Sequence, residues 1–331
     1  MQNKTIQWGI IGCGDVTEVK SGPAFSKVPN SKLVAVMRRN AEKGADYARR
    51  HNVDRWYSDA ESLINDPRVN AVYIATPPLY HKDYTLQALK AGKPVYVEKP
   101  MAINAMEARQ MAEAAKATGV KLCVAHYRRQ QPLFLKVKSL IAEGAIGDPR
   151  IVNLHCLQPH QDSMITRTED AWRYNPAISG GGLFHDLAPH QLDLMLYFFG
   201  RPDKVAGFSM NASQLYNAAD TTCGQVLFLK NLLLSGTWCF TVPQKRDSCE
   251  IIGTEGSLQF SIFDHRLLVL KKGDSERQFR FDPLPHVQQP MIQAVVEYFL
   301  GQIENPCPAE DGVEVMQMID AMAESNQPPC Q

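Results

Sequence analysis

Short apolar runs alternate with helix-like stretches through the first 125 residues, and this alternation limits the fold more than any other feature of the chain. The pattern is typical of a parallel sheet covered by helices on both faces, because strands buried on both sides are unbroken apolar runs. We therefore expect one doubly wound α/β domain over residues 1–125. Its expected strands are residues 6–11, 33–37, 71–75, 94–97 and 122–125, with helices at 41–51, 84–90 and 106–118.

The pattern changes after residue 126, where longer β-type runs are separated by turns such as Lys272-Gly273-Asp274. Runs of this kind indicate an antiparallel sheet. We expect a second, α+β domain over residues 126–331. The last helix of this domain is a candidate for packing against the first domain. The expected strands are residues 150–157, 205–210, 224–229, 232–241 and 248–252, with helices at 183–199, 290–302 and 312–323.

Charge and composition narrow the class of partner. The chain of 331 residues has 35 Lys and Arg against 35 Asp and Glu, whereas nucleic acids and anionic membranes are bound by an excess of basic residues. The first 125 residues carry 18 basic and 12 acidic side chains, a balance that suits a phosphate-bearing small ligand.

Segments for targeting and metal binding are not evident in the sequence. It has neither a membrane-length apolar run nor a secretory signal, which predicts a cytoplasmic protein without membrane contact. Its eight cysteines lack zinc spacing, so we expect reduced, mostly buried thiols and no metal site.

The first strand runs directly into Gly12-Cys13-Gly14-Asp15-Val16-Thr17. Two glycines thus lie where a strand turns into a helix, and backbone amides at such a turn accept a pyrophosphate. Thr17 replaces the third glycine of the usual GxGxxG motif, although a strand before and a helix after are the context that the motif requires. We expect residues 12–16 to bind a dinucleotide; the alternative is a plain tight turn.

The end of the second strand indicates which nicotinamide cofactor the chain prefers. A carboxylate at this position binds the ribose 2′-hydroxyl of NAD, whereas arginine accepts the 2′-phosphate of NADP. Here the strand ends in Met37-Arg38-Arg39-Asn40, without an acid. NADP(H) is therefore favoured, with NAD(H) as the alternative, unless Arg38 and Arg39 are ordinary surface charges.

Two further motifs carry polar groups that suit catalysis. The fourth strand ends in Glu98-Lys99-Pro100, which places Lys99 at the ligand-binding edge of a parallel sheet. At 100° per residue, Asp186, His190, Asp193 and Tyr197 form one narrow polar stripe on an otherwise apolar helix. Solvated helix faces are broader and rich in Lys and Glu, so we interpret the stripe as buried and chemically used; a core histidine is the alternative. Pro189 indicates that this helix begins near Leu187 or bends there.

Together, the GCGDVTEV turn, the Glu98-Lys99-Pro100 triplet and the GGG-x3-D-x3-H-x2-D run resemble the glucose-fructose oxidoreductase, inositol dehydrogenase and MocA (Gfo/Idh/MocA) family. Residues 91–95 and 253–258 extend the resemblance over most of the chain. It implies an N-terminal Rossmann domain and a C-terminal domain with a large open sheet that is often used for oligomer contact, hence a homodimer or homotetramer. Within the family, the chain resembles the 1,5-anhydrofructose reductases and related NADP-linked sugar enzymes.

The resemblance also implies roles for individual residues. Lys99, Asp186 and His190 would form the catalytic group in a cleft between the domains. A histidine that titrates near neutrality suits removal of the hydroxyl proton while hydride leaves the carbinol carbon, and Lys99 would stabilise the charge on that oxygen. Asp186 would orient the substrate or the imidazole. Cofactor contacts are implied for Glu98, Thr76, Pro77 and His81, with helix capping or packing as the alternative for the last three.

Aromatic and basic residues near the expected domain crossover are candidates for the sugar pocket. An aromatic ring stacks on the apolar face of a sugar, and arginine binds the sugar hydroxyls. On this basis the candidates for the sugar pocket are Arg128, Trp172 and Arg173. The alternatives are a core position for Trp172 and ordinary surface charges for the two arginines.

The sequence thus favours an NADP-dependent oxidoreductase acting on a carbonyl or secondary alcohol of a sugar or polyol. Two other functions stay open: a non-catalytic dinucleotide-binding sensor, and an NAD-linked polyol dehydrogenase of the inositol type. A non-catalytic sensor does not require Lys99, Asp186 and His190 around one substrate oxygen, so the presence of all three favours the enzyme.

Overall fold

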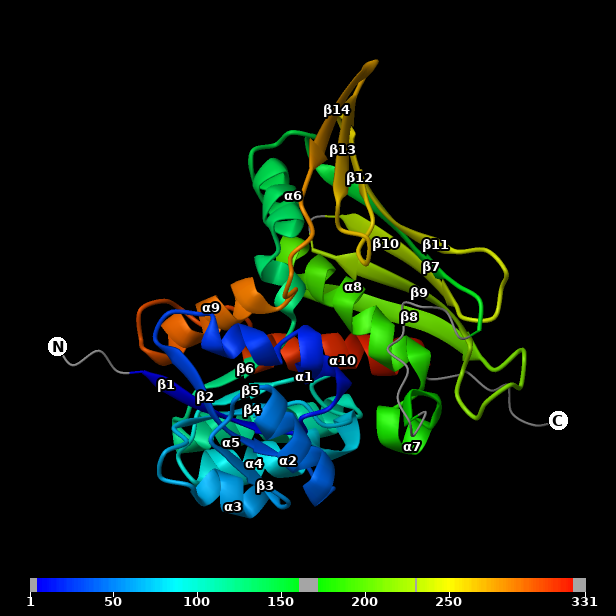
Figure 1. The fold of residues 1–331 in the computed structure, drawn as a ribbon. Coiled ribbons are helices and arrows are strands. Elements are labelled where there is room, and N and C mark those ends of the chain that lie inside the picture. The colour runs from blue at the N-terminus through cyan, green and yellow to red at the C-terminus, as the bar shows by residue number, and fades with distance from the viewer. Residues whose placement is uncertain (1–4, 161–171, 230, 324–331) are drawn as a thin grey trace. The chain divides into compact units, whose positions relative to one another are not determined.

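The computed structural model describes residues 5–160, 172–229 and 231–323. The chain divides into two compact units, whose helices and strands are drawn in Figure 1. Unit 1 consists of Met1–Gln130 with Leu284–Met316, and unit 2 of Gln131–Pro283 with Gln317–Gln331.

Unit 1 is built on a six-stranded sheet in the order β3-β2-β1-β4-β5-β6, in which every neighbouring pair is parallel. The strand order reverses between β1 and β4, and ligands of such sheets bind outside the carboxyl ends of the strands at this switch point. Helices cover both faces (Figure 1), which is why the central strands are apolar and buried. The strands are β1 (Ile6–Ile11), β2 (Ser31–Met37), β3 (Arg55–Tyr57), β4 (Ala71–Ile74), β5 (Val95–Val97) and β6 (Leu122–Val124).

Polar caps fix the starts of three helices in unit 1. The side chains of Asn40, Asp59 and Asn104 each accept a hydrogen bond from the backbone amide three residues later. Gly119 ends α5 in the left-handed conformation, with φ of 67°. The helices are α1 (Asp15–Val19), α2 (Ala41–Arg50), α3 (Ala60–Asn65), α4 (His81–Lys90), α5 (Ala105–Thr118) and α9 (Gln289–Phe299), with 3-10 turns at Gly22–Ser26, Pro78–Tyr80 and Tyr127–Gln130.

Unit 2 contains an eight-stranded sheet in the order β14-β13-β12-β11-β7-β10-β9-β8. Its pairs are antiparallel except β7 and β10, which run parallel. The strands are β7 (Pro149–Leu157), β8 (Pro202–Met210), β9 (Thr221–Phe228), β10 (Leu232–Cys239), β11 (Arg246–Gly253), β12 (Ser257–Phe260), β13 (Leu267–Lys272) and β14 (Ser275–Arg280).

The two faces of this sheet differ in burial. Val226, Leu234, Val152 and Ile251 form a cross-strand row with no exposed surface. The neighbouring residues point to the other face, because side chains alternate along a strand; two of them, Ile151 and Leu233, are 44% and 43% exposed. One face is therefore covered and the other is open in the single chain.

Two helices of unit 2, α6 and α8, pack on the buried face of its sheet (Figure 1). In α8 (Leu183–Phe199), the ring of Phe184 packs edge-on against Trp238 of β10, with 5.1 Å between centroids. The helix spans the range 183–199 that the sequence predicted and contains Pro189, so the first of the two effects expected of this proline, a start near Leu187, is wrong. The other helices are α6 (Pro132–Ala142), α7 (Pro176–Ser179) and α10 (Ala309–Ala323), with a 3-10 turn at Trp172–Tyr174.

The fold class expected from the sequence is confirmed: a parallel Rossmann sheet is followed by a mixed, mostly antiparallel sheet with helices. The expected elements omitted the helices α3, α6 and α7 and the strands β3 and β12–β14. In β3, Arg55 and Trp56 are exposed, and β14 has the sequence SERQFR, so neither shows an apolar run.

Residues 284–316 pack with unit 1, although they follow the second sheet in sequence. The Lys121 ammonium donates to the Tyr298 carbonyl over 2.6 Å, and Asn305 donates to the Leu122 carbonyl over 2.8 Å. α10 belongs to unit 1 as far as Met316 and then to unit 2. The domain limits at 125 and 126 stay a prediction.

Within the described ranges, no helix has the length and apolar character needed to cross a bilayer, and no group of three or more His, Cys, Asp or Glu side chains could hold a metal ion. The seven cysteines of this part of the chain have free thiols, and six of them are buried. The eighth, Cys330, lies outside the described residues.

Candidate functional site

The glycine turn after β1 has one glycine that the fold requires and one that faces open space. Gly12 has φ of 94°, and a Cβ there would lie 2.8 Å from Thr76 Cγ2 and 2.9 Å from the backbone carbon of Ala75. A Cβ on Gly14 would meet no atom within 4 Å. The turn therefore packs closely on the end of β4 while leaving room beside Gly14.

Thr17, which replaces the third glycine, is accommodated by a hydrogen bond. Its hydroxyl donates to the Gly14 carbonyl over 2.7 Å, and the side chain is fully buried. Asp15 and Val16 form the start of α1, a helix of five residues. Burial raises the pKa of the Cys13 thiol to about 11, so this side chain stays protonated and contributes packing.

Arg38 turns toward the same glycine turn. Its guanidinium donates to the Cys13 carbonyl over 3.2 Å, which places a positive charge at the carboxyl end of β2 beside β1. Arg39 is exposed and lies over the ring of Tyr80, 5.0 Å from the centroid. Arg38 is thus held against the glycine turn, whereas the exposure of Arg39 favours the alternative of an ordinary surface charge.

The loop after β4 supplies Thr76 and Pro77, both of which are half-buried. The Thr76 hydroxyl is buried and has no hydrogen-bond partner among the described residues. His81 has no exposed surface; its ring nitrogens lie 2.7 Å from the Thr76 carbonyl and 2.9 Å from the Pro100 carbonyl. This geometry favours the packing alternative for His81, which links the loops after β4 and β5.

Glu98, directly after β5, is only 6% exposed and is surrounded by donors. Its Oε1 accepts from the Tyr73 hydroxyl over 2.5 Å and from the Gln288 amide over 2.7 Å, and its Oε2 accepts from the Lys99 amide over 3.1 Å. These bonds satisfy the buried carboxylate and fix the turn that presents the half-buried Lys99.

Asp186 of α8 pairs with Arg173 in unit 2. Arg173 Nε donates to Asp186 Oδ2 over 2.9 Å, and the exposed fractions of the two residues are 7% each. Arg173 is therefore not an ordinary surface charge. Its guanidinium also lies over the Trp172 ring, 4.3 Å from the centroid, so the 3-10 turn holds both side chains beside the start of α8.

His190 follows Asp186 by about one helical turn and is 6% exposed. Its ring meets Phe263 edge-on, with 5.7 Å between centroids. Of the predicted polar stripe, Asp186, His190 and Asp193 are buried and Tyr197 is half-buried, but every residue of the helix from Leu183 to Leu196 is buried as well. Burial lowers the pKa of neighbouring His185 to about 4, so that imidazole is neutral.

The predicted site residues thus form two groups. In unit 1, the glycine turn, Arg38, Thr76 and Glu98-Lys99 follow the carboxyl ends of parallel strands. In unit 2, Asp186 and His190 lie in the N-terminal half of α8, and Arg173 of the 3-10 turn Trp172–Tyr174 pairs with Asp186. Arg128 belongs to unit 1 and is 6% exposed, so it is not a surface charge either.

Sequence reasoning did not identify the partners that hold these groups. Tyr73 lies in β4, a fully buried strand of mostly apolar sequence, where nothing distinguishes its hydroxyl as a hydrogen-bond donor. Gln288 lies 190 residues from Glu98 along the chain, so no local pattern connects the two. Arg173 and Asp186 were both predicted from the sequence as site residues. Their pairing was not predicted, because no periodicity connects the two positions.

Two family models match the chain over most of its length. One, described as "Oxidoreductase family, NAD-binding Rossmann fold", matches residues 6–126, and the other, described as "GFO/IDH/MocA C-terminal domain", matches residues 134–259. The chain belongs to the Gfo/Idh/MocA oxidoreductase family. This confirms the resemblance carried by the three motifs and makes the protein an oxidoreductase with an NAD(P)-binding domain.

Named relatives cover nearly the whole chain. Oxidoreductase P35 of Formosa agariphila is 46% identical over 95% of this chain and 97% of its own. The 1,5-anhydro-D-fructose reductase of Ensifer adhaerens is 28% identical over 93% and 92%. Among solved structures, levoglucosan dehydrogenase in complex with NADH and levoglucosan has a TM-score of 0.82 at 25% identity, covering 97% of each chain.

The residues of unit 1 fit a dinucleotide. Gly14 leaves open space where a pyrophosphate requires close approach of the backbone, and the buried Thr76 hydroxyl lies next to Gly12 without a partner among the described residues. Arg38 adds a positive charge at this turn.

Substituting the two glycines should separate their roles. Gly12→Ala introduces a contact with backbone at a positive φ, so we expect the free energy of unfolding to fall by about 1–3 kcal/mol. Gly14→Ala fills open space, so its melting temperature without ligand should equal that of the wild type while NADPH binding weakens about tenfold or more. Thermal melting and fluorescence titration with NADPH measure both effects. Unchanged NADPH affinity in Gly14→Ala would place the pyrophosphate elsewhere.

Proposed function

We propose that this protein is an NADP-dependent oxidoreductase that transfers hydride between nicotinamide and a carbonyl or secondary alcohol of a sugar or polyol. The observation that supports it best is the buried Arg173–Asp186 pair one helical turn before His190 in a family of dinucleotide oxidoreductases. The names of two relatives, a 1,5-anhydro-D-fructose reductase and a levoglucosan dehydrogenase, point to carbohydrate substrates.

In this proposal, residues of unit 1 bind the cofactor. Gly12, Cys13, Gly14 and the start of α1 at Asp15 and Val16 hold the pyrophosphate through the backbone. Thr76 and Pro77 line the loop next to it, and Glu98 orients the turn after β5. The bound cofactor supplies the acceptor or donor of hydride. His81, with its buried ring, positions the loops of Thr76 and Pro100.

The catalytic residues handle the proton and the charge on oxygen. In the oxidative direction the carbinol C–H electrons leave with hydride, the O–H proton passes to the His190 imidazole, and the carbon–oxygen bond becomes double. Lys99 hydrogen-bonds the same oxygen and stabilises its negative charge. Arg173 pairs with Asp186 Oδ2 and fixes the orientation of this carboxylate, which then accepts a hydrogen bond from a substrate hydroxyl. Arg128 and Trp172 contact the remainder of the sugar.

His190 should be essential for turnover but not for cofactor binding. We expect His190→Ala to lower kcat by about 10² or more, because the variant has no group to exchange the hydroxyl proton. NADPH affinity should remain within twofold of the wild type. The measurement is absorbance at 340 nm with a panel of sugars, anhydro sugars and inositols, followed by NADPH titration of both proteins.

An equally active His190→Ala variant would remove this residue from the mechanism. A wild-type protein that binds NADPH but reacts with no member of the panel would favour the sensor function over the enzyme.

Arg38 should determine the preference for the phosphorylated cofactor. A charge-assisted hydrogen bond contributes about 1.5–3 kcal/mol, so Arg38→Ala should weaken NADPH binding roughly tenfold to a hundredfold while NADH binding changes little. Arg39→Ala, which removes the exposed neighbour, is the matched control. Fluorescence titration of the three proteins with both cofactors measures this; tighter binding of NADH than NADPH by the wild type would favour the NAD-linked polyol dehydrogenase.

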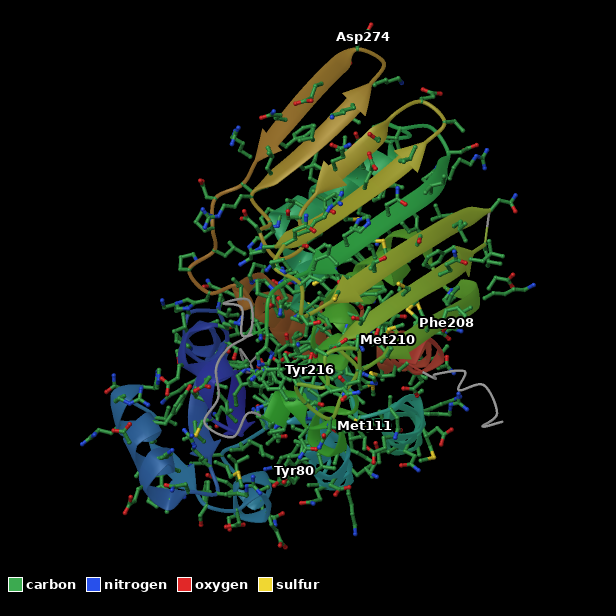
Figure 2. All side chains as sticks on the ribbon, turned by 90° about the vertical axis from the view of Figure 1, so that its right-hand side faces the viewer. Tyr80, Met111, Phe208, Met210, Tyr216 and Asp274 are labelled. Atoms are coloured by element: carbon green, nitrogen blue, oxygen red, sulfur yellow. The ribbon has the colours of Figure 1, made fainter. Side chains whose placement is uncertain are left out.

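The open face of the sheet in unit 2 is the surface that we assign to self-association. Leu227, Leu233, Ile151 and Ile252 form an apolar row across β9, β10, β7 and β11 on that face. Figure 2 shows Phe208 and Met210 on β8, which are 63% and 58% exposed. Exposed apolar surface of this kind is typical of protein interfaces, and it suits a homodimer or homotetramer.

Charges on this row should dissociate the oligomer. We expect the wild type to sediment as a dimer or tetramer and the double variant Ile151→Lys/Leu233→Lys to sediment as a monomer, because lysines cannot be buried unpaired. Asp274→Lys, at an exposed position in the turn between β13 and β14, adds a lysine outside this row and is the charge-change control. A monomeric wild type, or an unaffected double variant, would contradict the assignment.

A further inference from the structure

Three aromatic side chains of unit 2 form a cluster to which the proposed reaction assigns no role. The ring centroids of Tyr174 and Tyr216 are 4.9 Å apart, and His160 lies 5.5 Å from Tyr174 and 5.7 Å from Tyr216. The planes of His160 and Tyr216 differ by 20°, so these two rings are stacked. We call His160, Tyr174 and Tyr216 the aromatic cluster. All three residues retain part of their exposed surface.

The aromatic cluster is built from segments that meet at the start of α8. His160 follows the end of β7, and Tyr174 directly follows Arg173, the partner of Asp186. Tyr216 belongs to the loop between β8 and β9, labelled in Figure 2. In the same loop, Ala218 packs so closely on Gly182, the N-cap of α8, that a Cβ on Gly182 would approach it within 2.4 Å.

Polar atoms around the aromatic cluster are buried without hydrogen bonds to any described residue. They are the Tyr216 hydroxyl, His160 Nδ1 and both amide atoms of Gln158, a residue with no exposed surface. Gln158 donates its backbone N–H to the Cys239 carbonyl over 2.9 Å, and Cys239 is also a neighbour of the Tyr216 phenol. Buried polar groups in folded proteins normally have partners, so a group of this kind indicates a bound water or ligand.

We propose that the aromatic cluster is an outer subsite that binds the second, non-reacting ring of a glycoside or disaccharide whose first ring reacts beside Asp186 and His190. This inference rests on the proposed function and extends it to the class of substrate.

The chemistry of a sugar ring matches this subsite. A pyranose has an apolar C–H face that packs on aromatic rings and a rim of hydroxyls that requires donors and acceptors. The aromatic cluster supplies the rings, and the Tyr216 hydroxyl and His160 Nδ1, which have no partner among the described residues, supply polar atoms that donate or accept. Arg173, adjacent to Tyr174 and bonded to Asp186, joins this subsite to the proposed reacting group.

Binding of matched one-ring and two-ring sugars tests the proposal without turnover. The probes are the methyl glycosides of glucose, galactose, mannose and xylose and the corresponding α- and β-linked disaccharides, titrated by ligand-observed NMR with NADPH present. We expect the wild type to bind at least one disaccharide about tenfold more tightly than its methyl glycoside. Tyr216→Ala should abolish this preference, and Tyr216→Phe, which keeps the ring, should retain most of it.

His160→Ala removes a second ring of the aromatic cluster and should reduce the same preference, which guards against a folding defect specific to Tyr216→Ala. Trp56→Ala, which removes an exposed ring from β3 in unit 1, should not change it. Thermal melting of each variant checks folding.

A wild type without preference for any disaccharide overturns the proposal, as does an unchanged preference in folded Tyr216→Ala and His160→Ala. Failure of the proposed function has a different signature. In that case the disaccharide preference persists and responds to Tyr216, while no sugar is oxidised or reduced with either cofactor.

Discussion

All strands of the first sheet run in the same direction, and this constraint determines where the chemistry of unit 1 lies. Their carboxyl ends share one edge, so the residues that follow β1, β2, β4 and β5 are brought into one row. Those residues are the glycine turn, Arg38, Thr76 and Glu98-Lys99. The reversal of strand order between β1 and β4 opens the crevice in which such folds bind ligands.

Buried charge is the second constraint, and both units satisfy it with donors placed by the fold. Glu98 accepts from Tyr73, Gln288 and the Lys99 amide, and Asp186 accepts from Arg173. An unpaired buried carboxylate would be protonated or would destabilise the fold. The partners therefore keep these groups in one orientation, as a site that positions a cofactor or a hydroxyl requires.

The sequence predicted features that depend on local pattern. The limits of α8 follow from its apolar periodicity and flanking glycines, and the position of Lys99 follows from the end of a strand. It did not predict Gln288 as a partner of Glu98, because that contact depends on how distant segments pack. The aromatic cluster was missed for the same reason: His160, Tyr174 and Tyr216 come from separate segments and share no motif.

The return of residues 284–316 to unit 1 makes that unit discontinuous along the chain. Folding during synthesis generally proceeds from the N-terminus, one unit at a time. Here the Glu98 carboxylate lacks its Gln288 partner, and the edge strand β6 lacks the Asn305 contact, until almost all of the polypeptide has left the ribosome. The dinucleotide-binding unit is therefore completed late in translation, and a fragment ending near residue 130 would lack part of its own interior.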